Sequence, residues 1–200
     1  MKTTSSKTRR NAWALLLLGL VAMSPTSWAK DLTAFELAKE GDRYIGEQSK
    51  DKVVQIRSEK SVATLTPDIW YVVYYDPDAT LKAVEVKFGA GEKLDVSRPV
   101  RLLEPMTKAD EPLAAEKLKV DSDQALDIAK KEPLLEHLTL KASRLTLERR
   151  DIDDSTPVWK IHLWAAKLGN PNDDADIGEV VVSAGDGTVL KNDLKPANVD

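Results

Sequence analysis

Residues 120–190 decide the fold, with VDSDQALDIA at 120–129, PVWKIHLWAA at 157–166 and GEVVVSAGDGTVL at 178–190. In the first of these segments, the carboxylate of Asp121 can cap a helical turn while the side chain of Gln124 reaches back, as in a capping box. Small apolar residues at Ala125 and Ala129 supply a face that can lie close to a sheet. The spacing predicts a helix over Asp121–Ala129, which Pro133 ends or kinks.

Three strands are expected after this helix, at Ser143–Arg150, Val158–Lys167 and Gly178–Ala184, with a short edge at Thr188–Leu190. In the middle strand, apolar and polar residues alternate, which is the pattern of a half-buried strand. The inward set is Trp159, Ile161, Leu163 and Ala165.

The first half of the chain repeats this order of elements. Apolar spacing predicts a helix over Asp31–Gln48 with Asp31 as its cap. Strand-prone runs follow, and prolines punctuate the polar connection at residues 95–119. The predicted strands are Val53–Glu59, Ile69–Tyr75 and Thr80–Phe88.

Short matches between the halves favour an internal duplication. The helix segment at residues 34–39 aligns with 125–130, Trp70 falls near the position of Trp159, and Gly89-Ala90-Gly91 aligns with Gly185-Asp186-Gly187. Each pair has the same structural role, although chance matching is the alternative.

The second half resembles the PepSY family, a cystatin-like module of secreted and periplasmic proteins. The resemblance is carried by residues 120–125 with Ile128-Ala129, by Pro157–Ile161, and by Gly178–Val182 leading to residues 184–190. The first half departs from this pattern at Gly41 and at residues 89–92. The resemblance implies an α+β fold of two tandem cystatin-like units, each a helix packed on an antiparallel sheet of three to four strands. It also implies an extracytoplasmic module of the kind found in propeptides of secreted peptidases, and it supplies no catalytic residue.

The expected boundaries are a leader at residues 1–29, a first unit at 30–94, a connection at 95–119, a PepSY-like unit at 120–194 and a disordered tail at 195–200. The leader has basic residues before an apolar run at Ala12–Met23 and ends in Ser27-Trp28-Ala29, as in a signal peptide. An uncleaved anchor is the alternative, but twelve residues span only about 18 Å as a helix. Cleavage predicts a mature protein that starts at Lys30 in the periplasm or outside the cell, with no membrane attachment.

Charge and cysteine content exclude several classes of function. Loss of the leader removes four basic residues and no acidic ones, so the net charge moves from −4 to −8, which argues against nucleic acid and anionic lipid as partners. The chain has no cysteine, which excludes disulfides and thiol chemistry.

No catalytic set is visible in the sequence. The only histidines, His137 and His162, lie in no recognisable motif, and we expect no cofactor. Asp174 and Asp176 are candidate calcium ligands, but Ile177 stands where the calcium-loop pattern requires glycine, so a solvated hairpin tip is favoured.

Lys160, His162 and Trp164 share the outward face of the middle strand and are the candidate binding residues. Trp164 is expected either to be buried between the two units or to be exposed as an anchor for a partner. We therefore expect a non-enzymatic protein that binds a protein or peptide, with restraint of a peptidase as one role that the resemblance implies. The alternative is a small-ligand carrier or an enzyme with a pocket on the concave side of the sheet.

Overall fold

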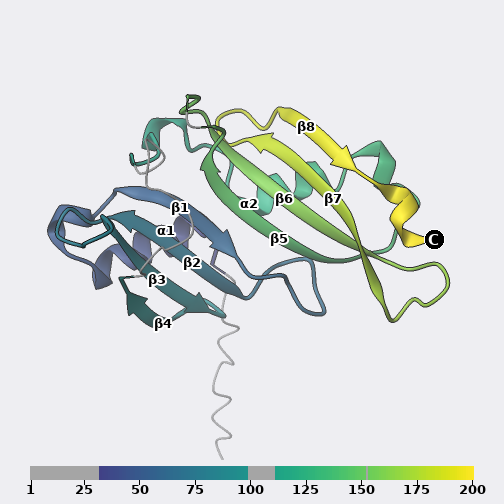
Figure 1. Ribbon diagram of the computed structural model, residues 1–200, viewed down its shortest axis with the longest axis horizontal. Coiled ribbons are helices and arrows are strands. Elements are labelled where there is room, and N and C mark those ends of the chain that lie inside the picture. The colour runs from purple at the N-terminus through teal and green to yellow at the C-terminus, as the bar shows by residue number, and fades with distance from the viewer. Residues whose placement is uncertain (1–31, 99–110, 152) are drawn as a thin grey trace, which may run out of the picture.

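The computed structural model describes residues 32–98, 111–151 and 153–200, and in these ranges the chain forms one antiparallel sheet of eight strands in the order β4-β3-β2-β1-β5-β6-β7-β8. Two short helices lie behind this sheet in Figure 1. The strands are β1 Val53–Ser58, β2 Ile69–Tyr75, β3 Ala83–Gly89, β4 Glu92–Ser97, β5 Leu140–Arg149, β6 Pro157–Ala166, β7 Asp174–Ser183 and β8 Val189–Leu194.

The helices are α1, Ala34–Gly41, and α2, Ser122–Ala129. Each begins with a capping box, formed by Thr33 with Glu36 in α1 and by Asp121 with Gln124 in α2. Short 3-10 turns complete the described structure at Asp42–Tyr44, Glu47–Ser49, Ala115–Lys117, Pro133–Leu135 and Pro196–Val199.

Period-two alternation builds a single core between the sheet and the helices. Trp70 and Trp159 are both buried on the helix-facing side, at 4% and 0% exposure, as predicted. The same core cluster takes in residues of α1, of α2 and of both halves of the sheet. Of the residues that the structure describes, none forms a helix on the other face of the sheet, which we call the open face (Figure 1).

A narrow seam joins the two halves of the sheet. Strands β1 and β5 are antiparallel neighbours, and their register pairs are Ile56↔Leu147 and Arg57↔Thr146. Next to these pairs, a side chain replaces the backbone as acceptor: the Leu145 amide donates a 2.9 Å hydrogen bond to Ser58 Oγ.

The beginnings of the two helices also meet. The backbone amide of Ala34 donates to Ser122 Oγ at 3.0 Å, and the amide of Phe35 donates to Asp121 Oδ1 at 3.2 Å. The ring of Phe35 lies 6.2 Å from that of Trp159 in the second half of the sheet. One carboxylate therefore serves the first turns of both helices.

The expected fold of two tandem helix-on-sheet units is wrong. The structure is mostly sheet, with one continuous eight-stranded sheet and only two short helices in the described ranges. The seam hydrogen bonds and the shared core favour this joined arrangement because they bury the edges that β1 and β5 would otherwise expose. Superposition of the two halves as a duplication stays a prediction.

Several element boundaries also differ from those expected. The first helix begins after Thr33 and not after Asp31, and it ends at Gly41, where a Cβ would collide with the Tyr74 hydroxyl. Strand β4 lies where the connection was expected to begin. The tail forms a 3-10 turn in which Val199 is buried. The carbonyl of Val199 accepts a hydrogen bond from the amide of Leu168.

The predicted leader and most of the predicted connection lie outside the described residues. Within the described ranges, neither helix has the length and apolar character needed to cross a bilayer.

Candidate binding surface

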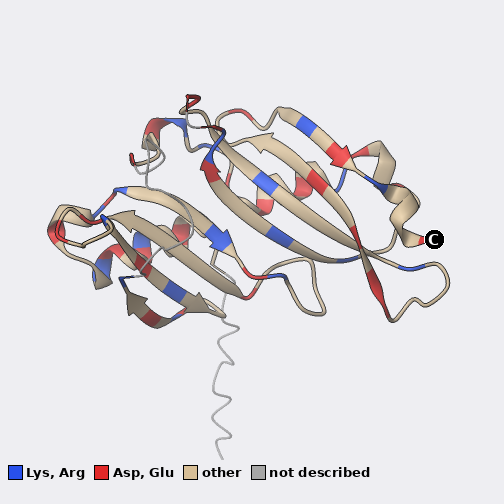
Figure 2. Ribbon diagram, viewed as in Figure 1, with Lys and Arg blue, Asp and Glu red and all other residues tan. Residues whose placement is uncertain are grey.

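The open face carries charged side chains that are mostly paired across strands. One cross-strand row runs over the whole sheet, and every link in it is a register pair: Asp95, Lys87, Tyr71, Arg57, Thr146, Lys160, Val181 and Lys191. In Figure 2, acidic and basic residues are interspersed along the strands from β3 to β8.

All four cations of this row are paired with carboxylates outside it, and Lys87 and Lys191 form the longer pairs, with Glu59 at 3.5 Å and with Asp193 at 3.6 Å. Arg57 pairs with Glu85 at 2.6 Å, and Lys160 pairs with Glu148 at 2.5 Å. Partial burial lowers the pKa of Lys160, but its carboxylate neighbours outweigh this effect and raise the pKa above its usual value. These pairs hold their side chains in place, and exposed pairs of this kind add little to stability.

A hollow of about 280 Å³, the central hollow, opens in the middle of the open face. Its lining comes from four adjacent strands: Gln55 and Arg57 of β1, Arg144, Thr146 and Glu148 of β5, Lys160 and His162 of β6, and Glu179 of β7. Arg144, His162 and Glu179 are direct cross-strand neighbours.

Among the cations that line the central hollow, Arg144 is the one without a direct ion pair. It is exposed, and its guanidinium has no ion pair or hydrogen bond with any described residue; it lies 5.8 Å from the Trp164 ring centroid. A guanidinium presents five donors in a planar fork that suits a carboxylate. The charge of Arg144 helps to lower the pKa of Asp176, but no carboxylate contacts it directly, so the central hollow offers one cation whose donors can bind an anionic group.

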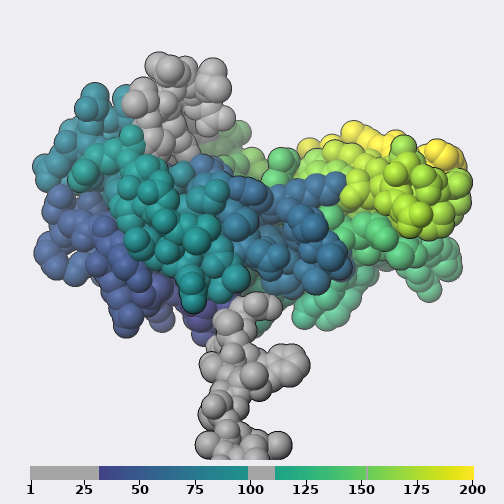
Figure 3. All heavy atoms as spheres, turned by 90° about the horizontal axis from the view of Figure 1, so that it is seen from below, coloured from purple at the N-terminus to yellow at the C-terminus, as the bar shows by residue number. Residues whose placement is uncertain are grey.

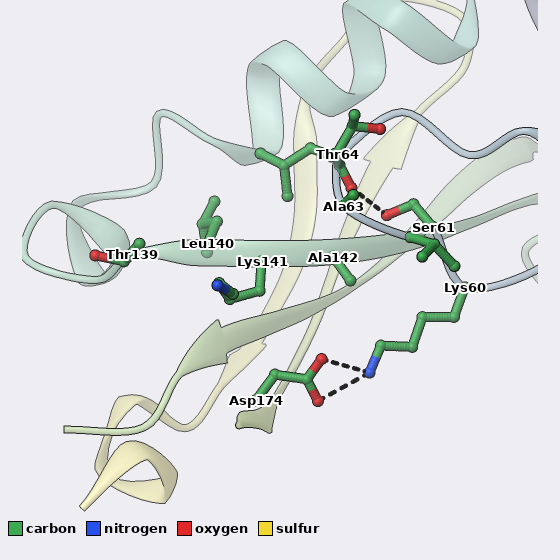
Figure 4. A pocket seen from close by; sticks show the side chains of 11 residues that line it. Lys60, Ser61, Ala63, Thr64, Thr139, Leu140, Lys141, Ala142 and Asp174 are labelled. Atoms are coloured by element: carbon green, nitrogen blue, oxygen red, sulfur yellow. Dashed lines mark hydrogen bonds and ion pairs between the residues drawn. The ribbon is translucent and has the colours of Figure 1, made fainter. Parts of the chain in front are cut away.

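A second recess, the end cleft, lies at the start of β5. It has a volume of about 740 Å³ and is lined by residues 60–65, by residues 139–142 and by Asp174. In Figure 4, Leu140, Lys141 and Ala142 follow one another along β5, and Lys60 reaches from the β1–β2 loop to Asp174. Seen from below in Figure 3, the β1–β2 loop (blue) stands beside the β6–β7 hairpin (yellow-green).

Trp164 lies between the two recesses. Lys60 of the end cleft sits over its ring with Nζ 4.6 Å from the centroid. From the central hollow, the His162 ring approaches to 4.6 Å. Trp164 is half-buried on the open face. It is neither enclosed between two units nor fully exposed, and cations and an imidazole hold its indole in place.

The three predicted binding residues come together on this surface. Lys160 and His162 line the central hollow, and Trp164 borders it. Sequence reasoning missed Arg144 and Glu179, because their position depends on the register between strands. The alternation within β5 and β7 was the only signal that placed them on the outward face.

The two predicted calcium ligands have different partners. Asp174 forms an ion pair with Lys60 at 2.8 Å, and Asp176 meets the His162 ring at 2.7 Å. Burial raises the pKa of Asp176, but His162 and the Gly178 amide outweigh it and hold the pKa below its usual value. No group of three or more metal-binding side chains occurs among residues 32–98, 111–151 and 153–200. His137 is exposed between the Pro133–Leu135 turn and β5.

Comparison with protein-family models, with curated proteins and with solved structures finds no match for this chain.

Proposed function

We propose that this chain is an exported, non-enzymatic binding protein that holds a protein or peptide partner against the open face of its sheet. One observation carries the proposal: the exposed guanidinium of Arg144, which forms no direct ion pair with the described residues, lies beside a half-buried tryptophan in the middle of a sheet face that no described helix covers. Arginine and tryptophan are the residue types that dominate binding energy at protein interfaces.

The side of the sheet under the helices supports the same class. Apolar side chains are packed on that side, among them Leu37, Trp159 and Ile161, each at 1% exposure or less. The central hollow, whose lining is mostly polar, opens on the opposite face, where a macromolecule can reach it. The resemblance of residues 120–190 to PepSY modules makes an exported peptidase the first partner to test.

The experiment is photo-crosslinking in the cell that exports the protein. A benzophenone amino acid at position 146, inside the central hollow, is expected to capture a single partner, while one at Lys131 on the helix side is expected to capture none. The complex is then rebuilt from purified proteins. Arg144→Glu is expected to weaken it at least about tenfold, as loss of a charged anchor does, and Lys131→Glu is the matched control.

Equal capture from both positions, or equal affinity of both charge-reversal variants, would exclude the open face as the binding surface. Export has its own test, because the intact mass of the protein from the cell is expected to begin at Lys30. A mass that includes Met1, in a membrane fraction, would contradict the export half of the proposal.

A small-ligand carrier is the second candidate function, and one groove favours it. A recess of about 240 Å³ between α1 and residues 113–118 is lined mainly by apolar side chains, including Phe35, Val53 and Leu113. A preformed apolar recess can hold a small apolar molecule. Saturable chemical-shift changes of the Phe35 and Leu113 signals on addition of an alkyl alcohol would support this function, and unchanged signals would remove it.

A further inference from the structure

Strand β5 has a free backbone edge inside the end cleft. Its register with β1 covers only Thr146 and Leu147. Closer to the start of β5, contacts from the β1–β2 loop take over, since the Ser61 amide donates to the Ser143 carbonyl at 2.8 Å and the Ser143 amide donates to Ser61 Oγ at 2.9 Å. Before Ser143, no described strand lies on this side of β5.

Lys141 stands at the centre of this free edge. The pairs between β5 and β6 pass from Leu140↔Ala165 to Ala142↔Trp164, so Lys141 is the extra residue of a β-bulge and has no partner on β6. Its side chain is exposed and takes part in no ion pair among the described residues. The other lysine of the end cleft, Lys60, is already paired with Asp174.

The free edge and the free cation select one kind of occupant. An extended peptide can add to an exposed strand edge through its backbone, with alternate side chains entering pockets beside the strand. Lys141 favours a carboxylate on that peptide by charge complementarity. The volume of about 740 Å³ falls within the range of ligand-binding recesses, which is about 300–1,000 Å³.

We propose that the end cleft binds an extended, acidic segment of a partner protein as an added strand along the start of β5, with a carboxylate of that segment paired to Lys141. This inference rests on the proposed function and names the part of the partner that is recognised. The peptide lies between the β1–β2 loop and the start of β7. From there, the partner continues over Trp164 toward Arg144 in the central hollow.

The probe is a library of random nine-residue peptides displayed on phage and selected on the full mature chain. Enriched peptides are expected to carry an acidic residue at a fixed position in a strand-forming sequence. A synthetic peptide of the enriched sequence is expected to lose about tenfold or more in affinity when Lys141 is changed to glutamate, and to regain it when its own carboxylate is changed to lysine. Lys131→Glu, a charge reversal outside the cleft, is expected to leave the affinity unchanged.

Backbone pairing is tested on the same peptide by N-methylation of one amide at a time. Only the peptide amides that face residues 140–142 can donate to β5, so methylation is expected to abolish binding at the alternate positions opposite this short edge and to be tolerated elsewhere. Equal effects at all positions, or no acidic preference among the selected peptides, would overturn the inference.

Two further outcomes separate this inference from the proposed function. Selected peptides that respond to Arg144→Glu and not to Lys141→Glu would move the site to the central hollow, which overturns the cleft inference and keeps the proposed function. A dimer in sedimentation equilibrium that Lys141→Glu converts to monomer would show that a second copy of this chain occupies the cleft, which would also overturn the cleft inference. A chain that selects no peptide, and whose crosslinks ignore the open face, would lose both proposals.

Discussion

Replacement of Asp121 by alanine is expected to destabilise both helices and not only the helix that it caps. The carboxylate accepts hydrogen bonds from the Ser122 amide at 2.6 Å and from the Phe35 amide at 3.2 Å, and these amides belong to the first turns of α2 and α1. The negative charge also lies where the positive ends of two helix dipoles meet. Both effects are lost together in the alanine variant.

The expected cost is the sum of a lost cap and a lost charged acceptor. Removal of an N-cap costs about 1 kcal/mol. The second helix adds about 1–2 kcal/mol, because the Phe35 amide loses a charge-assisted hydrogen bond in a partly buried position. The total is about 2–3 kcal/mol in the free energy of unfolding. Asp121→Asn keeps an acceptor and loses only the charge, so it is expected to cost about 0.5–1 kcal/mol.

The assay is urea unfolding followed by tryptophan fluorescence, with the slope checked for constancy between variants. The matched control is Asp123→Ala, since the carboxylate of Asp123 serves only an amide of its own helix, that of Gln124. A double-mutant cycle of Asp121→Ala with Thr33→Ala, the cap of α1, is expected to be non-additive by about 0.5 kcal/mol or more. Additive costs, or a cost for Asp121→Ala no larger than for Asp123→Ala, would refute a cap shared between the helices.

Three further changes have expected outcomes. Burial raises the pKa of Asp76, but a backbone amide and the Arg98 guanidinium outweigh it and hold the pKa below its usual value. The stability that this gives is present above about pH 4 and is lost as the pH falls through the folded-state pKa. Asp76→Asn is therefore expected to flatten the acid side of a plot of urea midpoint against pH, and an unchanged plot would contradict this. Gly178→Ala is expected to cost about 3 kcal/mol or more, because residue 178 has φ +97° and a Cβ would strike a backbone carbonyl of β8, whereas Gly169→Ala, with open space around it, is expected to be neutral in the same measurement. Trp159→Ala is expected to cost about 3–5 kcal/mol as a core truncation, and a cost below 1 kcal/mol in chemical unfolding would show that the site is not core.

Local patterns in the sequence predicted the elements whose signals are local. The capping box of Asp121 and Gln124 fixed the start of α2, and alternation in β6 separated Trp159 from Trp164 onto opposite faces. The first helix has an equally local signal, the capping pair of Thr33 and Glu36, and the helix begins there and not at the expected cap, Asp31.

The remaining differences come from tertiary pairing. Strand β4 has the segment Glu-Lys-Leu-Asp-Val-Ser, which is mostly exposed, and it is a strand because β3 supplies its ladder. The seam between β1 and β5 joins residues far apart in the sequence, so no short sequence pattern predicts it. Arg144 reached the candidate site for the same reason: its place opposite His162 is set by strand register.

The seam also sets the order in which the fold can be completed. Ser58 and Leu145, which are bonded across it, stand 87 residues apart in the chain. If the chain crosses the membrane with its N-terminal end first, β1 emerges well ahead of β5 and stays uncovered until β5 has followed. During that interval the first four strands present a central edge to their surroundings, and such an edge is a template for wrong pairing. A partly emerged chain that ends before residue 140 is therefore the state in which a chaperone would protect the β1 edge.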